Sequence, residues 1–201
     1  IQMKENKYDD NIFFQKYSQM SRSQQGLAGA GEWETLRKLL PDFKDKRVLD
    51  LGCGYGWHCI YAMEHGASSV VGVDISHKML EVAKEKTHFP QVEYKCCAIE
   101  DVEFPEESFD VILSSLAFHY VADYEILVKK IYRILKSGGK LVFTVEHPVF
   151  TAYGTQDWHY NEKGEILHFP VDNYYYEGKR TAVFLGEKVT KYHRTLTTYL
   201  N

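Results

Sequence analysis

The stretch that most constrains the fold is RVLDLGCGYG, residues 47–56, in which an apolar run of strand type leads directly into three alternating glycines. Glycine permits a tight turn and lets the backbone approach a ligand closely. The next stretch, residues 57–66, is typical of a helix that ends at a glycine. A helix N-terminus after such a turn favours a carboxylate or phosphate ligand, because it offers unpaired N–H groups and a positive dipole.

Strand and helix patterns alternate from this motif to residue 145. We predict strands at residues 47–51, 68–74, 92–96, 109–115 and 140–145. We predict helices at residues 57–66, 77–86 and 124–135, with a turn at 136–139 before the last strand. This alternation favours βαβ units, hence an α/β fold with a parallel, doubly wound sheet and helices on both faces. Ligands of such sheets bind beyond the C-terminal ends of the strands.

The flanking segments are less regular. Residues 9–20 read as a short amphipathic helix, 21–31 as a loop, and 32–40 as a helix that Pro41 ends. Residues 148–190 are polar and aromatic, and we predict an insertion of loops and hairpins over the ligand end of the sheet, followed by a last strand near 188–200. Polar-aromatic segments can line small-molecule pockets.

Composition excludes several classes of protein. The 201 residues carry a net charge of −4, which gives no basic face for nucleic acid. No apolar run approaches the ~18 residues of a membrane span, and no secretory leader opens the chain. The four cysteines form no C-x-x-C pair, so we expect no metal site and reduced thiols in a cytoplasmic protein.

Two acids accompany the glycine motif. Asp50 lies two residues before Gly52, and Asp74 ends the second predicted strand. A carboxylate in the position of Asp74 can accept hydrogen bonds from both hydroxyls of a ribose. A nicotinamide-dependent oxidoreductase shares this acid, but its glycines follow G-x-G-x-x-G rather than the G-x-G-x-G found here.

The segments VLDLGCGYG, VVGVDISHKML, CAIED and SFDVILSSLAFHYV resemble the class I S-adenosylmethionine-dependent methyltransferases. The resemblance is to the small-molecule branch that includes the quinone-biosynthesis enzymes, and it covers roughly residues 45–147. It implies a Rossmann-like fold, S-adenosylmethionine as cofactor and methyl transfer to a small-molecule substrate. A non-catalytic S-adenosylmethionine-binding protein is the alternative within this resemblance, and a homo-oligomer is left open.

The resemblance also implies roles for residues of the glycine motif. The backbone of Gly52, Cys53 and Gly54 is expected to line the methionine end of the cofactor. Asp50 is expected to order this loop and to help hold the cofactor's ammonium group, or to be purely structural. Asp74 is expected to bind the ribose diol.

A second group is expected around the adenine. Ile75 and Met79 would pack on the ring, although a helical methionine such as Met79 is often simply core. The N–H of Ile99 would reach a ring nitrogen. Family members usually carry an aspartate where this chain has Ala98, so Glu100 or a backbone carbonyl is expected to bind the adenine amino group instead.

The remaining candidates are two cofactor-binding serines and three catalytic residues, which are Tyr17 on the N-terminal helix, His119 and His147. Ser114 and Ser115, at the end of the fourth strand, are expected to face the methionine part of the cofactor. Tyr17 matches a family position that closes over the cofactor. His119 and His147 follow the fourth and fifth strands, and histidine is the usual general base near pH 7. We favour His147 because it directly follows the fifth strand and precedes Pro148, which stiffens the chain there. For His119 the alternative is a packed, structural histidine.

We interpret residues 1–201 as one methyltransferase domain. It comprises an N-terminal helical cap (1–44), a cofactor-binding core (45–147), and an insertion or substrate lid with the last strand (148–201). Family sheets have seven strands, whereas the sequence predicts five and one more near the end. We therefore expect a C-terminally shortened form, or an insertion that substitutes for the sheet edge.

Overall fold

The computed structural model describes residue 4 and residues 6–201. These residues form two compact units. The first, here the sheet unit, contains the described residues up to Phe118 together with Asp123–Thr144. The second, here the hairpin unit, contains His119–Ala122 and Val145–Asn201. Each unit is described by itself.

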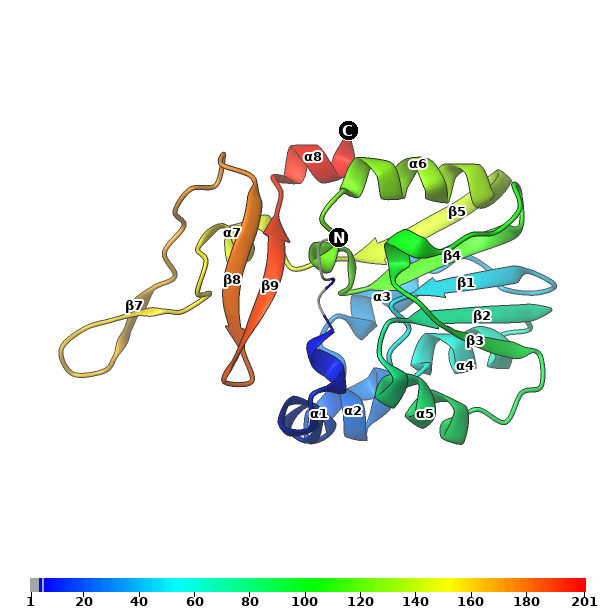
Figure 1. Ribbon diagram of the computed structural model, residues 1–201, viewed down its shortest axis with the longest axis horizontal. Helices are drawn as coiled ribbons and strands as arrows, with labels where there is room; N and C mark the ends of the chain where they lie inside the picture. Colours follow the sequence, from blue (N-terminus) through cyan, green and yellow to red (C-terminus); the bar gives the residue numbers. More distant parts are fainter. Residues whose placement is uncertain (1–3, 5) are drawn as a thin grey trace. The chain divides into compact units, whose positions relative to one another are not determined.

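The sheet unit is built on five parallel strands in the order β3-β2-β1-β4-β5 (Figure 1). Their bounds are β1 Arg47–Leu51, β2 Ser69–Asp74, β3 Val92–Cys96, β4 Phe109–Ser115 and β5 Leu135–Thr144. The chain steps outward from β1 to β2 and β3, and then in the opposite direction from β4 to β5. The strand order therefore reverses between β1 and β4, and the doubly wound α/β fold predicted from the sequence is confirmed.

The helices of the sheet unit follow from local sequence signals. They are α4 Trp57–Glu64, α5 His77–Lys86 and α6 Tyr124–Ile134. Ser76 caps α5 by accepting a hydrogen bond from the N–H of Met79, and Asp123 caps α6 in the same way through Ile126. Right-handed crossovers place α4 and α5 together and α6 on the opposite face, because the connections run in opposite directions along the sheet (Figure 1).

The N-terminal segment contains more helix than the sequence predicts. Its elements are η1 Lys7–Asp9, α1 Asn11–Ser18, α2 Ser21–Gln24, η2 Gly26–Gly29 and α3 Trp33–Leu39. The loop predicted at 21–31 is therefore wrong, because two short helical turns occupy most of it. The turns pack closely: a Cβ on Gly29 would lie 2.3 Å from the carbonyl oxygen of Ser21.

The fifth strand begins earlier than predicted. Leu135 pairs with Phe109, whereas Lys140 pairs with Val111, so residues 136–139 form a bulge inside β5 rather than a turn before it. Gly138 has a φ of 75°, which a bulge of this kind accommodates at a glycine. The polar KSGG run masks strand pairing in the sequence, because its side chains alone are typical of a turn.

The hairpin unit contains short helices and two antiparallel hairpins. Its elements are α7 Pro148–Ala152, β6 His159–Tyr160, β7 Ile166–His168, β8 Gly178–Phe184, β9 Glu187–His193 and α8 Leu196–Leu200. Strand β9 confirms the last predicted strand, but it pairs with β8 in a separate two-stranded sheet. The strand ends at His193, and Thr195 caps α8, so the final residues are helical rather than extended.

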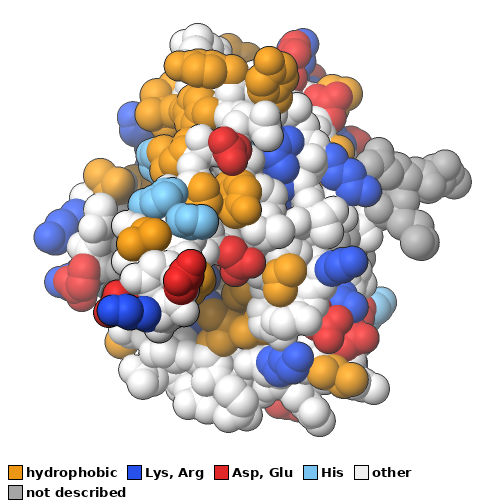
Figure 2. Space-filling model, turned by 90° about the vertical axis from the view of Figure 1, so that its left-hand side faces the viewer, with side chains coloured by type: hydrophobic (Ala, Val, Ile, Leu, Met, Phe, Trp, Pro, Cys, Tyr) orange, Lys and Arg blue, Asp and Glu red, His pale blue; other side chains and the backbone are white. Residues whose placement is uncertain are grey.

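Apolar side chains are exposed on the hairpin unit. Figure 2 shows hydrophobic side chains gathered beside histidines on one face of the molecule. The large exposed apolar residues of this unit include Trp158, Tyr160, Ile166, Leu167, Val171, Tyr175 and Tyr176. None of the helices in the described part of the chain has the length and apolar character needed to cross a membrane.

Candidate cofactor site

The glycine motif forms a loop that only glycine can follow. Gly52, Gly54 and Gly56 all have positive φ, at 77°, 53° and 74°. A Cβ on Gly52 would lie 2.5 Å from the Cβ of Ala117, and one on Gly56 would lie 2.1 Å from the hydroxyl of Tyr94. The loop therefore needs glycine both for its conformation and for its close packing.

The end of β2 holds this loop in place. The N–H groups of Gly52 and Cys53 donate to the carbonyl oxygen of Val73, at 2.8 and 2.9 Å. The N–H of Gly54 donates to Oδ2 of Asp74 at 2.9 Å. The side chain of Asp74 thus hydrogen-bonds the loop directly.

Asp74 also holds the N-cap residue of α5 in place, since its Oδ1 accepts from the N–H of Ser76 at 2.9 Å. Burial raises the pKa of Asp74 to about 6, although the hydrogen bonds from Ser76 and Gly54 favour the charged form. An ionised carboxylate has about four acceptor positions. The backbone of Ile75 also hydrogen-bonds this carboxylate, beside Ser76 and Gly54.

Asp50 lies under the loop and is fully enclosed. It is 1% exposed, and its Oδ2 accepts from the thiol of Cys59 at 3.5 Å. Its Oδ1 has no hydrogen-bond partner among the described residues. Burial raises the pKa of Asp50 to about 7, with a further contribution from the nearby Asp74 carboxylate.

Two residues predicted for the adenine lie against the loop. The methyl of Met79 would be 3.2 Å from a Cβ on Gly54, and Cδ1 of Ile99 would be 3.4 Å from a Cβ on Gly52. Ile75 follows Asp74 at the end of β2. The structure therefore brings this apolar group and the glycine loop together.

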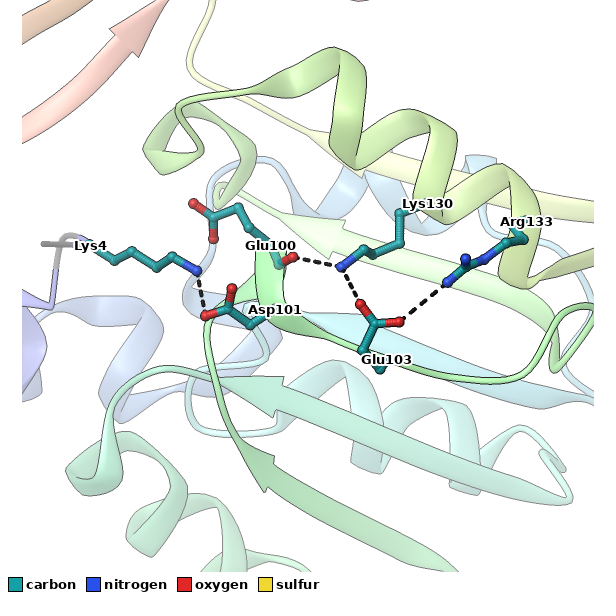
Figure 3. A network of polar contacts seen from close by, with 6 residues as sticks. All are labelled: Lys4, Glu100, Asp101, Glu103, Lys130 and Arg133. Atoms are coloured by element: carbon teal, nitrogen blue, oxygen red, sulfur yellow. Dashed lines mark hydrogen bonds and ion pairs between the residues drawn. The ribbon is translucent and has the colours of Figure 1, made fainter. Parts of the chain in front are cut away.

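Ala98 is buried and precedes the short helical turn η3, Ile99–Asp101. A polar network fixes this turn against α6 (Figure 3). Lys130 donates to the carbonyl oxygen of Glu100 at 2.7 Å and pairs with Glu103 at 2.9 Å. The carbonyl of Glu100 is therefore already engaged, while its carboxylate makes none of the contacts drawn in Figure 3.

The other charged residues extend the same network. Arg133 on α6 also contacts Glu103, at 3.3 Å, and Lys4 pairs with Asp101 (Figure 3). The hydrogen bond and charge of Lys130 lower the pKa of Glu103. Helix α6 thus anchors the segment around Ile99 that is predicted to hold the adenine, although α6 itself carries none of the motif residues.

The two serines at the end of β4 have different roles. Ser114 is buried and donates to the carbonyl oxygen of Leu51 at 2.8 Å, which ties β4 to β1. Ser115 points elsewhere, as alternation along a strand requires, and lines a cavity at the glycine loop. The expected contact with the methionine part of the cofactor remains a prediction, and the cavity favours Ser115 for it.

The cavity opens to solvent, and the space within it and its mouth together is about 490 Å³. Its lining includes the predicted residues Tyr17, Gly52, Cys53, Gly54 and Ser115. Tyr17 packs edge-on against Tyr55, with ring centroids 5.9 Å apart, and burial raises its pKa to about 12. The structure thus joins the N-terminal helices to the glycine loop around one space.

Several residues of this lining were not predicted from the sequence. Arg22 and Ser23 belong to α2, in the stretch predicted as a loop, while Trp57 and His58 start α4. Burial lowers the pKa of His58 to about 4, which makes it neutral near pH 7. Trp57 and His58 could have been found from their position directly after the glycine motif. For Arg22, no pattern in the neighbouring sequence indicates a place in the site.

The predicted catalytic histidines belong to the hairpin unit. His119 is buried, its Nδ1 accepts from the N–H of Glu146 at 3.5 Å, and burial lowers its pKa to about 4. His147 is exposed and caps α7, since its Nδ1 accepts from the N–H of Val149 at 3.1 Å. The neutral form of each ring therefore carries its proton on Nε2.

A buried ion pair lies close to His119. Lys191 donates to Glu146 at 2.5 Å and to Gln156 at 3.0 Å, and Gln156 donates to Glu146 at 2.8 Å. Burial would raise the pKa of Glu146, but His119 and Lys191 bring it below the usual value. His193 on β9 engages Thr151 and the carbonyl of Tyr174 through its two ring nitrogens, so it is a structural residue.

The family model described as a methyltransferase domain matches residues 49–143. This match begins in β1 and ends in β5, so it spans the predicted cofactor-binding core.

Among the described residues, no group of three or more histidine, cysteine, aspartate or glutamate side chains is arranged to hold a metal ion.

Two solved structures resemble most of the chain. A Listeria monocytogenes protein assigned to the S-adenosylmethionine-dependent methyltransferases is 58% identical, with a TM-score of 0.81 over 85% of this chain and 80% of that one. An S-adenosylmethionine-dependent methyltransferase from Mesorhizobium loti is 41% identical, with a TM-score of 0.80 over 88% of this chain and 80% of that one.

A curated relative matches a shorter region. The ubiquinone biosynthesis O-methyltransferase of Coxiella burnetii is 36% identical over 112 residues, which are 55% of this chain and 47% of that protein. The chain thus spans about half the length of this relative. The predicted similarity to the quinone-biosynthesis enzymes is confirmed.

Proposed function

Because the chain belongs to the S-adenosylmethionine-dependent methyltransferases, we propose that it methylates a small molecule and holds its cofactor in the cavity at the glycine loop. The family membership confirms methyl transfer as the activity and S-adenosylmethionine as the cofactor. It also overturns the nicotinamide-dependent and the non-catalytic alternatives.

The single observation that carries the placement is the glycine loop with Asp74. The loop lies where a Cβ on Gly52 or Gly56 would collide with its neighbours, and it borders the cavity directly. Asp74 presents a carboxylate beside the loop, and a carboxylate in this position suits the hydroxyls of a ribose. Met79 and Ile99 add apolar surface at the same loop, which suits an adenine ring.

S-adenosylmethionine would supply a methyl group on a positively charged sulfonium, and its sulfur would leave as the neutral thioether of S-adenosylhomocysteine. The chain's own residues then bind, orient and exclude water, and this positioning is the main source of rate in our proposal. Tyr17 is suited to exclusion of water, because it is half-buried at the cavity wall. It stays neutral near pH 7, since burial raises its pKa to about 12.

We propose His119 and His147 as residues that donate a hydrogen bond from Nε2. In both rings Nδ1 accepts a backbone N–H, so a neutral ring has no free lone pair to take a proton. His147 could act as a base only after its ring left Val149. We therefore propose that His147 orients the substrate by donating a hydrogen bond, rather than acting as the general base predicted from the sequence.

Replacement of His147 by alanine tests that role. We expect turnover to fall less than about tenfold, because a lost general base typically costs 10²–10⁴-fold. The matched control is His159→Ala, an exposed histidine of β6 in the same unit. A loss of 10²-fold or more for His147→Ala, with His159→Ala unchanged, would restore the general-base role.

The acceptor is best sought with a library of small molecules. Similarity to a ubiquinone biosynthesis O-methyltransferase supports the inclusion of phenols beside amines and carboxylic acids. Release of S-adenosylhomocysteine above the rate without acceptor identifies a substrate. If the active preparations methylate only macromolecules and none of the small molecules, the proposed acceptor class is wrong.

We also propose that the protein works in the cytoplasm. Cys53, Cys59, Cys96 and Cys97 are all free thiols. A chain whose thiols all remain unpaired suits a reducing compartment. Fractionation of cells followed by immunodetection tests this, and recovery from an oxidising compartment would contradict it.

A further inference from the structure

A polar cluster in the hairpin unit has no part in the cofactor site described above. It consists of Glu146, Gln156 and Lys191, with His119 beside it. Lys191 is 2% exposed, and a charged side chain so far from water is costly unless it is paired. The three residues of the cluster all lie beyond residue 143, where the match to the family model ends. The cluster is thus built outside the matched methyltransferase domain.

The ammonium group of Lys191 is committed to this cluster. It donates to Oε1 of Glu146 and to Oε1 of Gln156. Its Nζ also lies 5.5 Å from the ring centroid of Phe184 and 6.0 Å from that of Tyr120, within the range of cation–π contacts. Lys191 is therefore suited to hold a neighbour in place rather than to bind a ligand itself.

Glu146 keeps the capacity for a further hydrogen bond. Its Oε1 accepts from Lys191 and its Oε2 from Gln156, whereas a carboxylate has about four acceptor positions. Its side chain is 20% exposed, so Glu146 is not sealed off from solvent as Lys191 is. Glu146 follows the last residue of β5 by two positions, and ligands of such sheets bind beyond the C-terminal ends of the strands. Glu146 can therefore accept a hydrogen bond from a ligand.

His119 adds a donor beside this acceptor. Its Nδ1 accepts from the backbone N–H of Glu146, so the neutral ring carries its proton on Nε2. Within the described part of the chain, Nε2 has no hydrogen-bond partner, and it is not among the enclosed polar atoms that lack one. The Nε2–H group is therefore open to solvent. A donor next to an acceptor suits a group that both accepts and donates, as a hydroxyl or an amine does.

We infer that Glu146 binds the methyl acceptor through a hydroxyl or amine group, which donates a hydrogen bond to its carboxylate, and that Lys191 is the positioning residue of this carboxylate. The inference rests on the proposed methyl transfer to a small molecule. An ionised Glu146 repels a carboxylate in the same place, so carboxylic acids are excluded as acceptors. The choice of acceptor then depends on the charge of Lys191, which keeps Glu146 ionised.

The neighbours of Glu146 set its ionisation. His119 and Lys191 face its carboxylate, Tyr199 of α8 lies within electrostatic range of it, and Arg194 acts on His119. Burial lowers the pKa of His119 to about 4 and raises the pKa of Tyr199, so neither side chain changes charge between pH 5.5 and pH 8. Burial alone would raise the pKa of Glu146, and Lys191 helps to lower it. Loss of Lys191 therefore raises this pKa, and the carboxylate takes up a proton as the pH falls.

The pH dependence of turnover separates positioning from a purely structural role. The probe is the member of a library of phenols, amines and carboxylic acids that has the highest kcat/KM, followed by release of S-adenosylhomocysteine. The kcat/KM of each variant is divided by that of the unaltered chain at the same pH, so that ionisation of the probe cancels. For Lys191→Met we expect this ratio to be at least about threefold lower at pH 5.5 than at pH 8, because the carboxylate becomes protonated. Lys191→Arg keeps the charge, and its ratio should be equal at the two pH values.

Two further variants complete the experiment. Lys188→Met removes an exposed lysine of the same strand, β9, and is the matched control, with a ratio that does not depend on pH. Gln156→Met removes the hydrogen bond to Oε2 of Glu146 without loss of a buried charge. Its ratio should fall with pH as that of Lys191→Met does, by a smaller factor. It also tests the inference if Lys191→Met does not fold. Affinity for S-adenosylhomocysteine, measured by calorimetry, should be unchanged in all of these variants.

The outcomes distinguish this inference from the proposed function. A ratio that is equally low at both pH values in Lys191→Met, or that does not fall with pH in Gln156→Met where Lys191→Met is unfolded, would overturn the positioning role. Turnover of carboxylic acids alone would overturn the binding of a hydroxyl or amine by Glu146, while methyl transfer to small molecules stands. No turnover of any small molecule by the unaltered chain would overturn the proposed function and this inference together.

Discussion

Asp74 and Asp50 show how two acids of one motif come to serve different purposes. Asp74 accepts two backbone N–H groups and still faces the loop, whereas Asp50 is enclosed beneath it with one oxygen unpartnered. Burial raises the pKa of both acids, to about 6 and about 7. Asp74 is therefore suited to a ligand, and Asp50 is a buried group whose charge costs stability.

The pH dependence of unfolding tests this view of Asp50. Its pKa is raised from about 4 in an unfolded chain to about 7 in the fold. The folded state then binds the proton more tightly, so this contribution is complete below pH ~4 and is lost as the pH rises through ~7. Three pKa units correspond to at most about 4 kcal/mol.

We expect Asp50→Asn to remove this loss. Urea unfolding at pH 5 and pH 8 should show a smaller decline in the free energy of unfolding for the variant than for the unaltered chain. Asp42→Asn, at an exposed position, is the matched control and should follow the unaltered chain. An identical decline in Asp50→Asn would show that Asp50 does not carry the raised pKa.

At the level of elements, long and regular patterns could be predicted, whereas features set by tertiary contacts could not. The strand RVLDL and the helix capped by Ser76 follow from periodicity and capping alone. The bulge at 136–139 depends on pairing with β4, which a polar run conceals. In the site, the glycine loop and Asp74 were predicted, but Arg22 reaches the cavity only through the packing of the N-terminal helices.

The contact of α6 with η3 gives a prediction of its own. Lys130→Ala removes the hydrogen bond to the carbonyl of Glu100 and the pair with Glu103. We expect the free energy of unfolding to fall by about 1 kcal/mol, the usual net worth of a hydrogen bond. Affinity for S-adenosylhomocysteine should fall a few-fold, because the segment around Ile99 loosens.

Lys129→Ala is the matched control on the same helix. Lys129 is exposed, and it forms an ion pair with its helical neighbour Glu125. It should change neither quantity measurably. Equal effects of the two substitutions, by chemical denaturation and calorimetry, would show that the network of Figure 3 does not support the segment.

The whole molecule combines a sheet unit that carries the cofactor motifs with a hairpin unit that carries His119 and His147. The family model ends within β5, so it leaves almost all of the hairpin unit unmatched, while the two solved structures extend well beyond it. The matched region therefore contains the glycine motif and Asp74. We propose that the hairpin unit contributes to the choice of acceptor.

A crystal structure of the chain with S-adenosylhomocysteine tests the placement of the cofactor most directly. We predict that the ligand occupies the cavity at the glycine loop, with its ribose hydroxyls on the carboxylate of Asp74. A ligand bound outside this cavity, or one whose ribose lies away from Asp74, would contradict the proposed site.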